Sequence, residues 1–527
     1  MAAKGSPDWN AMVDLELAAK NLEREAYGDW YRDPWGWPEL RFAVKKARGR
    51  IHDRLSGSGT FQVALVDVPK ENFGSRPAMV MDPLDRLIYT GVVDALSAKL
   101  IGDLSNDAFG WRLHRGNYAK GHYARNADEW SYFRGHIGDL SGKYEAALVT
   151  DIVSCFANVS MTAVKDVVHS RAGSGLLPDR LLGLVESWDN VAGRRGLPQR
   201  SSASAVLANA VLSSMDHVLS NHARVVKRKR RKDPSHVSAA RWMDDMWLFG
   251  ADAGRLRQAQ FALQEEARSL GLDLNSGKTE LLEGAEVEER VLEIEHSAVD
   301  TALGFSLIVG GEEISRNIEP LETLLERLIA QGETASRTSM RFATSRMRWH
   351  TVFDRVPDLL ETAERMPHAA DHLSRLFRDA VAPGDYEEWF LAHVKSHWAT
   401  FEWSTAAFGT TLPSTRRPRT KTLNLFERFV SEARVQLPLF ALAAQRLAAW
   451  DPNRCRRAAR EAVTTNANPH YRRVVALAAV GAREPRTVVR GWLKDQEENR
   501  LTLDMLEAQN FAPAKVVEDF SGLDETD

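Results

Sequence analysis

The spacing of apolar residues changes twice along the chain and divides it into three regions. Residues 1–60 show a loosely helical spacing, interrupted by a turn-forming stretch rich in Pro, Gly and Trp. Residues 61–315 mix β-rich runs with helical repeats, whereas residues 316–527 show helical spacing alone. The sequence therefore predicts an α+β fold with an N-terminal helical extension and an all-α C-terminal region.

The middle region opens with two β-rich runs and a long helix. We predict strands at residues 61–68 and 78–81, then a helix that begins at Pro83 and presents apolar residues as far as Leu100. A continuous apolar run at residues 146–152 is typical of a buried strand. Further helices are predicted at residues 160–169, from 201 onward and at 258–270, and a further strand at 303–309.

The C-terminal region contains short amphipathic segments separated by prolines. Residues 437–450, 455–463 and 471–480 are examples, with Pro452 and Pro469 between them. Helix pairs of this length are typical of α-repeat proteins, although the sequence contains no strict repeat.

Net charge limits how the chain can bind nucleic acid. The chain has 527 residues, which is enough for about two to four domains. Its formal net charge is −3, so binding to nucleic acid requires a local basic patch. The strongest basic run, residues 224–232, is a phosphate-binding patch, a solvated hairpin or a localisation signal. Its candidate nucleic-acid-binding residues are Lys227, Arg228, Lys229, Arg230 and Arg231.

Cysteine usage and hydropathy predict the compartment. Cys155 and Cys455 are the only cysteines, which gives neither a disulfide framework nor a zinc-binding spacing and fits a reducing cytoplasm. Residues 1–10 lack a secretory pattern, and no apolar run is long enough to span a membrane. We therefore expect a cytoplasmic protein without a membrane partner.

Three carboxylates stand in apolar surroundings. Asp244 and Asp245 interrupt an apolar run, and Asp151 closes the strand predicted at residues 146–152. Burying carboxylates is costly unless the charge is compensated, and a divalent cation at the strand ends would compensate it. Phosphoryl transfer by two metal ions uses such a set. The structural alternatives are a solvated Asp-Asp turn and a capping or turn role for Asp151.

Other polar residues of the middle region also have both a structural and a functional interpretation. Lys70 and Arg76 flank the turn between the first two strands, where they are either solvated cations or contacts for a triphosphate. Asn209 and Asp216, on the helix predicted from residue 201, have capping or core hydrogen bonding as their structural role.

The ordered series of these motifs resembles reverse transcriptases over roughly residues 61–309. The Asp-Ile-Val-Ser-Cys-Phe run at 151–156 resembles their first palm motif. Gly-Leu-Pro-Gln at 196–199, followed by Leu-Ala-Asn at 207–209 and by Asp216, resembles their second. Trp-Met-Asp-Asp at 242–245 resembles their Tyr-x-Asp-Asp box. Residues 271–275, with Lys278 and Thr279, resemble the motif that follows this box in the family. Pro69-Lys70, Arg76 and residues 85–87 resemble the motifs of the fingers.

The resemblance implies a right-hand polymerase with fingers and palm, acting on dNTPs and on DNA or RNA with Mg²⁺ or Mn²⁺. It makes Asp151 and Asp244 catalytic metal ligands, supported by Asp245. The nucleotide-binding residues that it implies are Lys70 and Arg76 at the triphosphate, Phe156 under the sugar, Gln199 near the nucleotide or template, and Lys278. Lys278 is either a general acid toward pyrophosphate or a surface cation.

Two positions depart from the family pattern. Arg200 follows Gln199 where the family usually has Gly, and Trp242 replaces the usual Tyr of the Asp-Asp box. Both departures indicate an unorthodox arrangement of template or primer.

A reverse transcriptase joined to an α-repeat region resembles the abortive-infection and defense-associated (AbiK-like) bacterial group. That resemblance implies antiphage defense, a homo-oligomer, a possible non-coding RNA partner and, in some members, protein-primed DNA synthesis without a template. Tyr386 and Tyr471, the only tyrosines of the C-terminal region, are the candidate priming residues. The alternatives are an RNA-binding scaffold with a reduced active site, an RNA polymerase that uses rNTPs, and a toxin that acts through the helical region.

Overall fold

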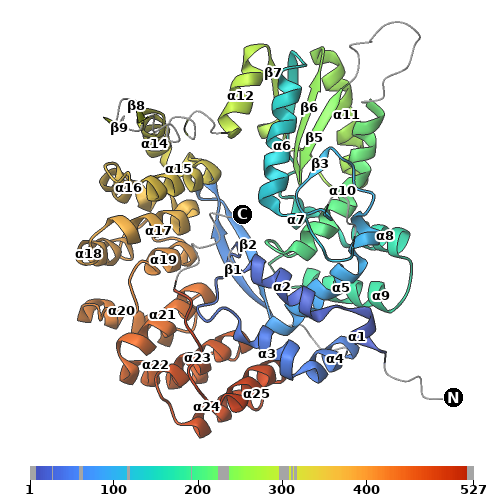
Figure 1. Cartoon of the computed structure of the whole chain (residues 1–527). Coiled ribbons are helices and arrows are strands. Elements are labelled where there is room, and N and C mark those ends of the chain that lie inside the picture. Colours follow the sequence, from blue (N-terminus) through green and yellow to red (C-terminus); the bar gives the residue numbers. More distant parts are fainter. Residues whose placement is uncertain are drawn as a thin grey trace, which may run out of the picture.

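The protein is described by a computed structural model (Figure 1). It covers residues 7–26, 28–57, 63–114, 119–191, 193–222, 237–295, 299, 308–309, 312–313 and 317–518. The candidate nucleic-acid-binding run, with Lys227, Arg228, Lys229, Arg230 and Arg231, lies outside the described residues. Most of the strand predicted at 303–309 also lies outside them, although β8 (Ile308–Val309) pairs with β9 (Glu312–Glu313).

A five-stranded sheet forms the centre of the middle region, and both of its faces are covered by helices. Trp247 and Phe249 pack with apolar residues of α6 and α12 on one face, while Leu148 and Leu248 join the main core on the other, with α10 and α11. The strand order is β3-β5-β6-β4-β7. The strands are β3 (Ala108–Phe109), β4 (Ala146–Thr150), β5 (Ser238–Trp242), β6 (Asp245–Gly250) and β7 (Glu280–Glu283). The covering helices are α6 (Asn126–Ser141), α10 (Ser202–His222), α11 (Ala253–Ser269) and α12 (Ala285–Glu295).

A separate two-stranded hairpin precedes the sheet in the chain, and a long helix follows the hairpin. Strand β1 (Val63–Pro69) pairs antiparallel with β2 (Ser75–Met81), and the short 3-10 helix η1 (Glu71–Phe73) lies in their turn. Helix α5 (Pro83–Ile101) begins with Pro83 after an Asp82 cap, as its sequence predicts. The other helices of the middle region are α7 (Cys155–Asn158), α8 (Met161–Ala172) and α9 (Leu176–Asp189).

The N-terminal helices lie against the end of the chain, a contact that local sequence does not predict. The buried Arg473 donates hydrogen bonds to both Asp33 and Glu39, at 2.7–3.0 Å, so one guanidinium joins two N-terminal carboxylates to the C-terminal region. The N-terminal helices are α1 (Trp9–Met12), α2 (Leu15–Glu25), α3 (Pro38–Lys46) and α4 (Arg48–Ser56).

Every regular element described between Glu319 and Ala508 is a helix, as the apolar spacing predicts. Pro452 and Pro469 stand in the first turns of their helices, where a missing N–H costs nothing. None of the described helices combines the length and apolar character needed to cross a bilayer. The α-helices are α14 (Glu319–Gln331), α15 (Arg337–His350), α16 (Val356–Thr362), α17 (Ala370–Ala380), α18 (Pro383–His393), α19 (Glu402–Gly409), α20 (Thr420–Ser431), α21 (Leu437–Trp450), α22 (Pro452–Thr465), α23 (Pro469–Gly481), α24 (Arg486–Leu493) and α25 (Arg500–Ala508).

Candidate active site

The register of the sheet brings the three candidate carboxylates to one edge. The ladder between β4 and β6 pairs Thr150 with Met246. One step further along this ladder, Asp151 follows β4 beside Asp245, the first residue of β6. Asp244 precedes Asp245 in the tight turn between β5 and β6, where Met243 has a φ of 55°. Residues almost a hundred positions apart therefore meet because two strands pair.

These carboxylates repel one another. Desolvation, followed by the charges of Asp244 and Asp151, raises the pKa of Asp245 to about 7, and desolvation together with the charge of Asp151 raises the pKa of Asp244. One buried oxygen of Asp151, Oδ1, accepts no hydrogen bond. A buried acceptor without a donor, beside two more carboxylates, is an arrangement that a bound cation would stabilise.

The donor set fits a divalent ion that keeps part of its coordination for the substrate. Within the described ranges, no three or more His, Cys, Asp or Glu side chains are arranged as a ready-made metal site. Mg²⁺ commonly takes one or two carboxylates and completes its shell with water and substrate phosphate oxygens. Asp151 and Asp244 provide such a partial set of oxygen ligands.

Lys278 lies directly on the Asp151 carboxylate. The backbone N–H of Asn275 donates to the Asp151 carbonyl at 2.8 Å, and this contact holds the 3-10 helix η2 (Ser276–Lys278) beside β4. Lys278 Nζ then donates to Asp151 Oδ2 at 2.9 Å. Desolvation opposes the charge on Lys278, but the hydrogen bond and the charge of Asp151 outweigh it and raise the pKa of the lysine. Lys278 is thus a cation with a specific partner at the site.

The two fingers cations also lie near these carboxylates. Lys70 follows β1 and its Nζ donates to Ser154 Oγ at 3.4 Å, while Arg76 lies in β2 opposite Val68. Desolvation and then the charges of Arg76 and Lys278 lower the pKa of Lys70. Lys70 and Lys278 therefore lie near Asp151, and Arg76 lies near Lys70 and is influenced by Asp244. The sequence could suggest these cations only as separate candidates.

A glycine turn holds the second palm motif against the first. Gly196 has a φ of 68°, and a Cβ at this position would lie 2.2 Å from the Phe156 carbonyl oxygen. Leu197 N donates to that same oxygen at 2.7 Å. Phe156 lies in α7 and is half-buried against the main core, and Gln199 lies three residues after Gly196. Only glycine allows this close approach of the two backbones.

An arginine that sequence reasoning missed fixes the tip of the β5–β6 hairpin. Arg241 donates to both carboxylate oxygens of Asp216 at 2.7 Å, to Asn209 Oδ1 at 2.9 Å and to the Met243 carbonyl at 2.8 Å. Asn209 and Asp216 thus have the core hydrogen-bonding role that was one of their predicted alternatives. The available signal was an arginine inside an apolar run, since arginine is almost never buried without a partner.

A protein-family model matches the middle of the chain. Residues 68–306 match the family model for reverse transcriptase (RNA-dependent DNA polymerase). The match supports nucleotidyl transfer of reverse-transcriptase type. It also confirms the predicted fold class, in which reverse-transcriptase-like fingers and palm precede a helical region.

The whole-chain comparisons show weaker likeness. No curated protein matches the sequence. Among solved structures, telomerase from Candida albicans in complex with a fragment of telomeric RNA has 12% identity and a TM-score of 0.31, with 75% of this chain and 68% of that chain covered. Apo telomerase from Candida tropicalis has 10% identity and a TM-score of 0.27, with 70% and 66% covered.

The two departures from reverse-transcriptase motifs have structural explanations. The Trp242 ring packs edge-on to Trp130, with ring centroids 4.9 Å apart, and Gly110 leaves room beside it. Arg200 retains a positive φ of 57°, the backbone region that favours glycine, and its guanidinium lies over Trp30 at 4.4 Å. Residue 200 therefore has a backbone conformation that glycine adopts readily, but it carries a charged side chain.

The hydroxyl groups of both candidate priming tyrosines are engaged by backbone carbonyls. Tyr386 is 1% exposed and its hydroxyl donates to the Phe408 carbonyl at 2.9 Å. The hydroxyl of the half-buried Tyr471 donates to the Val435 carbonyl at 2.9 Å, and desolvation raises its pKa to about 12. Burial and these hydrogen bonds argue against either hydroxyl as a primer in this conformation.

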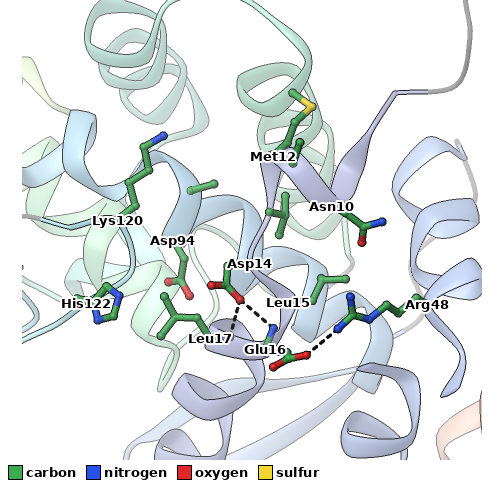
Figure 2. A pocket seen from close by; sticks show the side chains of 13 residues that line it. Asn10, Met12, Asp14, Leu15, Glu16, Leu17, Arg48, Asp94, Lys120 and His122 are labelled. Atoms are coloured by element: carbon green, nitrogen blue, oxygen red, sulfur yellow. Dashed lines mark hydrogen bonds and ion pairs between the residues drawn. The ribbon is translucent and has the colours of Figure 1, made fainter. Parts of the chain in front are cut away.

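A hollow of about 440 Å³ lies at the N-terminal helices (Figure 2). Asp14, in its lining, caps α2 through two backbone N–H groups, and Glu16 pairs with Arg48 at 2.7 Å. None of the three candidate catalytic carboxylates lines it. These local hydrogen bonds give the polar groups Asp14, Glu16 and Arg48 a structural role.

Proposed function

We propose that the reverse-transcriptase portion adds deoxynucleotides to a 3′-hydroxyl by phosphoryl transfer, with Asp151 and Asp244 as ligands of Mg²⁺ or Mn²⁺ and Asp245 supporting the site. The observation that carries this proposal is that three carboxylates meet at one end of paired strands, where a buried Asp151 oxygen has no donor. The site also has the cations that a triphosphate requires.

Each residue then has a chemical task. Bound divalent ions would stabilise charge on the attacking and leaving oxygens. Lys70 and Arg76 would bind the triphosphate from the hairpin, and Phe156 would lie beneath the sugar, with Gln199 near the nucleotide or template. Lys278 is a cation that donates a hydrogen bond to Asp151. When metal ions bind Asp151, Lys278 would leave this carboxylate and donate a proton, or contribute its positive charge, to pyrophosphate.

The test is dNTP incorporation with Mg²⁺ by wild type and by Asp244→Asn. We expect the variant to lose incorporation while its melting temperature holds or rises, because one repelling charge is removed. Asp252→Asn is the matched control, since this exposed residue caps α11 and Asn caps a helix equally well. Full activity of Asp244→Asn would contradict the assignment.

The same assay separates the two alternative functions. Preferential incorporation of rNTPs by wild type would indicate an RNA polymerase, against which the ring of Phe156 argues. Absence of incorporation with either nucleotide set, with RNA binding retained, would indicate an RNA-binding scaffold. The intact set of Asp151, Asp244 and Asp245 favours the enzyme.

We further propose that the protein acts in the cytoplasm in antiphage defense, as a homo-oligomer and in part without a template, with a non-coding RNA as a partner to be tested. The support is the resemblance to the abortive-infection group and the helical region that follows the palm. Phage plating on cells that express wild type or Asp244→Asn tests the role. Protection that is equal in both strains would separate defense from the polymerase site.

Protein priming is the least supported part of this proposal, because both candidate tyrosines donate their hydroxyl protons to backbone carbonyls. Labelled dNTPs, followed by denaturation, would reveal label attached to protein. If label is attached, its persistence in Tyr386→Phe and Tyr471→Phe would move the primer to a Ser or Thr hydroxyl.

A further inference from the structure

Three arginines from distant parts of the chain surround one indole ring. Arg76 of β2, Arg200 before α10 and Arg337 of α15 place their guanidinium carbons 5.1, 4.4 and 5.1 Å from the Trp30 ring centroid. We call these three residues and Trp30 the arginine cluster. Trp30 and Arg337 lie outside the matched residues 68–306, so the cluster joins both flanking regions to the reverse-transcriptase portion.

The cluster carries more positive charge than its surroundings neutralise. Asp371 accepts from Arg337 at 2.9 Å and from Arg32 at 3.3 Å through the same oxygen, Oδ2. In the described part of the chain, no carboxylate lies within ion-pair distance of Arg76 or Arg200. Arg76 Nε is buried and has no hydrogen-bond partner. Two guanidinium groups thus remain available for an anion.

The positive charges of the cluster oppose one another. Desolvation and then the charges of Arg337 and Arg76 lower the pKa of Arg200 to about 10, and desolvation and Arg337 lower the pKa of Arg76. Arg200 is nevertheless exposed to solvent and holds an unfavourable positive φ. A residue that adds both backbone strain and charge repulsion at a solvent-accessible position costs stability, which is typical of functional sites.

We propose that the arginine cluster binds successive phosphates of a single-stranded nucleic acid next to the nucleotide site, with Arg76 shared between the strand and the triphosphate and with Arg200 and Arg337 outside the proposed triphosphate contacts. All three guanidinium carbons lie within 5.1 Å of one centroid, so they span at most about 10 Å, which accommodates two or three successive phosphates of a strand. Trp30 is buried and is not a stacking platform, so recognition would be through the backbone.

The strand is favoured over a free anion because the charges are spread around a ring and continue toward the carboxylates. Arg76, itself a member of the cluster, is influenced by the charges of Arg337, Glu71 and Asp244, so the cluster extends toward the proposed metal site. This inference rests on the proposed nucleotidyl transfer for its biological meaning, but strand binding is measurable without synthesis.

The test uses the full chain, a fluorescent 20-nucleotide single strand of mixed sequence, and EDTA to prevent synthesis. Arg200→Gln should lower affinity about tenfold at low salt, and should lower the slope of log affinity against log salt by about 0.7, the value for one phosphate contact on a single strand. Arg428→Gln is the matched control, because Arg428 also lies over an aromatic ring, Phe429, but is exposed on α20.

Arg200→Gly is the second variant, and it distinguishes binding from folding. Glycine suits the positive φ and removes the repelled charge, so the melting temperature should rise while strand affinity falls. An unchanged slope in both Arg200 variants, or no strand binding by wild type, would overturn the proposal.

A second binding titration, with dATP in place of the single strand, tests whether the cluster binds the triphosphate instead. Its affinity should be the same in wild type and Arg200→Gln. A loss of dATP affinity with unchanged strand binding would assign the cluster to the triphosphate and overturn the proposal. Because both arms measure binding, a failure of incorporation in the activity assay would not be mistaken for a failure of the cluster.

Discussion

Arg241 and Asp216 form a buried, two-bonded ion pair that joins the hairpin of the candidate active site to helix α10, with both N–O distances at 2.7 Å. The arginine is 1% exposed and the aspartate 6% exposed. Because Arg241 also donates to the Met243 carbonyl, the pair fixes the backbone directly before Asp244. We regard Arg241 as a positioning residue that acts through the hairpin.

Breaking this pair should destabilise the protein strongly. Arg241→Met leaves Asp216 as an uncompensated buried carboxylate, and such losses cost about 3–5 kcal/mol in free energy of unfolding. The double variant Arg241→Met with Asp216→Leu should recover much of this loss. Chemical denaturation of the four proteins in the double-mutant cycle measures it. Additive effects of the two substitutions would show that the pair contributes no coupling energy.

The carboxylate site should make the metal-free protein less stable as pH rises from about 4 to 7. The folded-state pKa of Asp245 is raised to about 7, whereas an unfolded Asp titrates near 4. Between these values the folded state binds more protons, so the free energy of unfolding falls with pH. Melting curves of wild type and Asp245→Asn without divalent ions should diverge across this window, with the variant more stable at pH 8.

Magnesium should reverse this trend, because it binds the ionised carboxylates. Its stabilising effect on wild type should be larger at pH 8 than at pH 5, where protons compete for the same oxygens. Asp245→Asn, measured at both pH values, controls for general salt effects. A stability difference between wild type and variant that does not change with pH would contradict the raised pKa.

Phe156 is expected to select the sugar of the incoming nucleotide. Its ring would occupy the space of a 2′-hydroxyl, and an unpaired buried hydroxyl costs about 1–3 kcal/mol, so Phe156→Ala should lower dNTP-over-rNTP discrimination by up to about 100-fold. Phe261→Ala, on the exposed surface of α11, is the matched control. Kinetics with both nucleotide sets, together with melting temperatures, provide the measurement.

The partial burial of Phe156 predicts how much stability its truncation should cost. The side chain is half-buried against the main core, so its truncation should cost less stability than the loss of a fully buried ring, about 3–5 kcal/mol. A stable variant with unchanged sugar preference would exclude the gate. A parallel loss of both activities together with stability would instead make Phe156 a core residue.

The basic run is expected to bind nucleic acid through phosphates. Replacing Lys227, Arg228, Lys229, Arg230 and Arg231 with Gln should lower the log–log salt slope of binding by about 0.7–0.9 for each phosphate that the variant no longer neutralises. Gln substitutions in the basic stretch at residues 416–421 provide a control of similar charge. A slope equal to that of the control would leave the run as a solvated segment.

The sequence alone determined the elements and the chemical types of the site. Apolar spacing and caps predicted β4 and α5, because local spacing encodes which face of an element is buried. The order of Asp151, the Gly-Leu-Pro-Gln motif and the Asp244-Asp245 pair predicted a reverse-transcriptase-like palm, which the family match supports.

Only the tertiary structure decided which of these residues meet. The Lys278–Asp151 contact depends on a segment that crosses beside β4, and the Arg241–Asp216 pair on the packing of a helix against a hairpin. The gathering of Arg200 and Arg337 on Trp30 joins residues from three regions of the chain. Apolar periodicity specifies burial one element at a time, whereas these contacts depend on strand register and on long-range packing, and local spacing records neither.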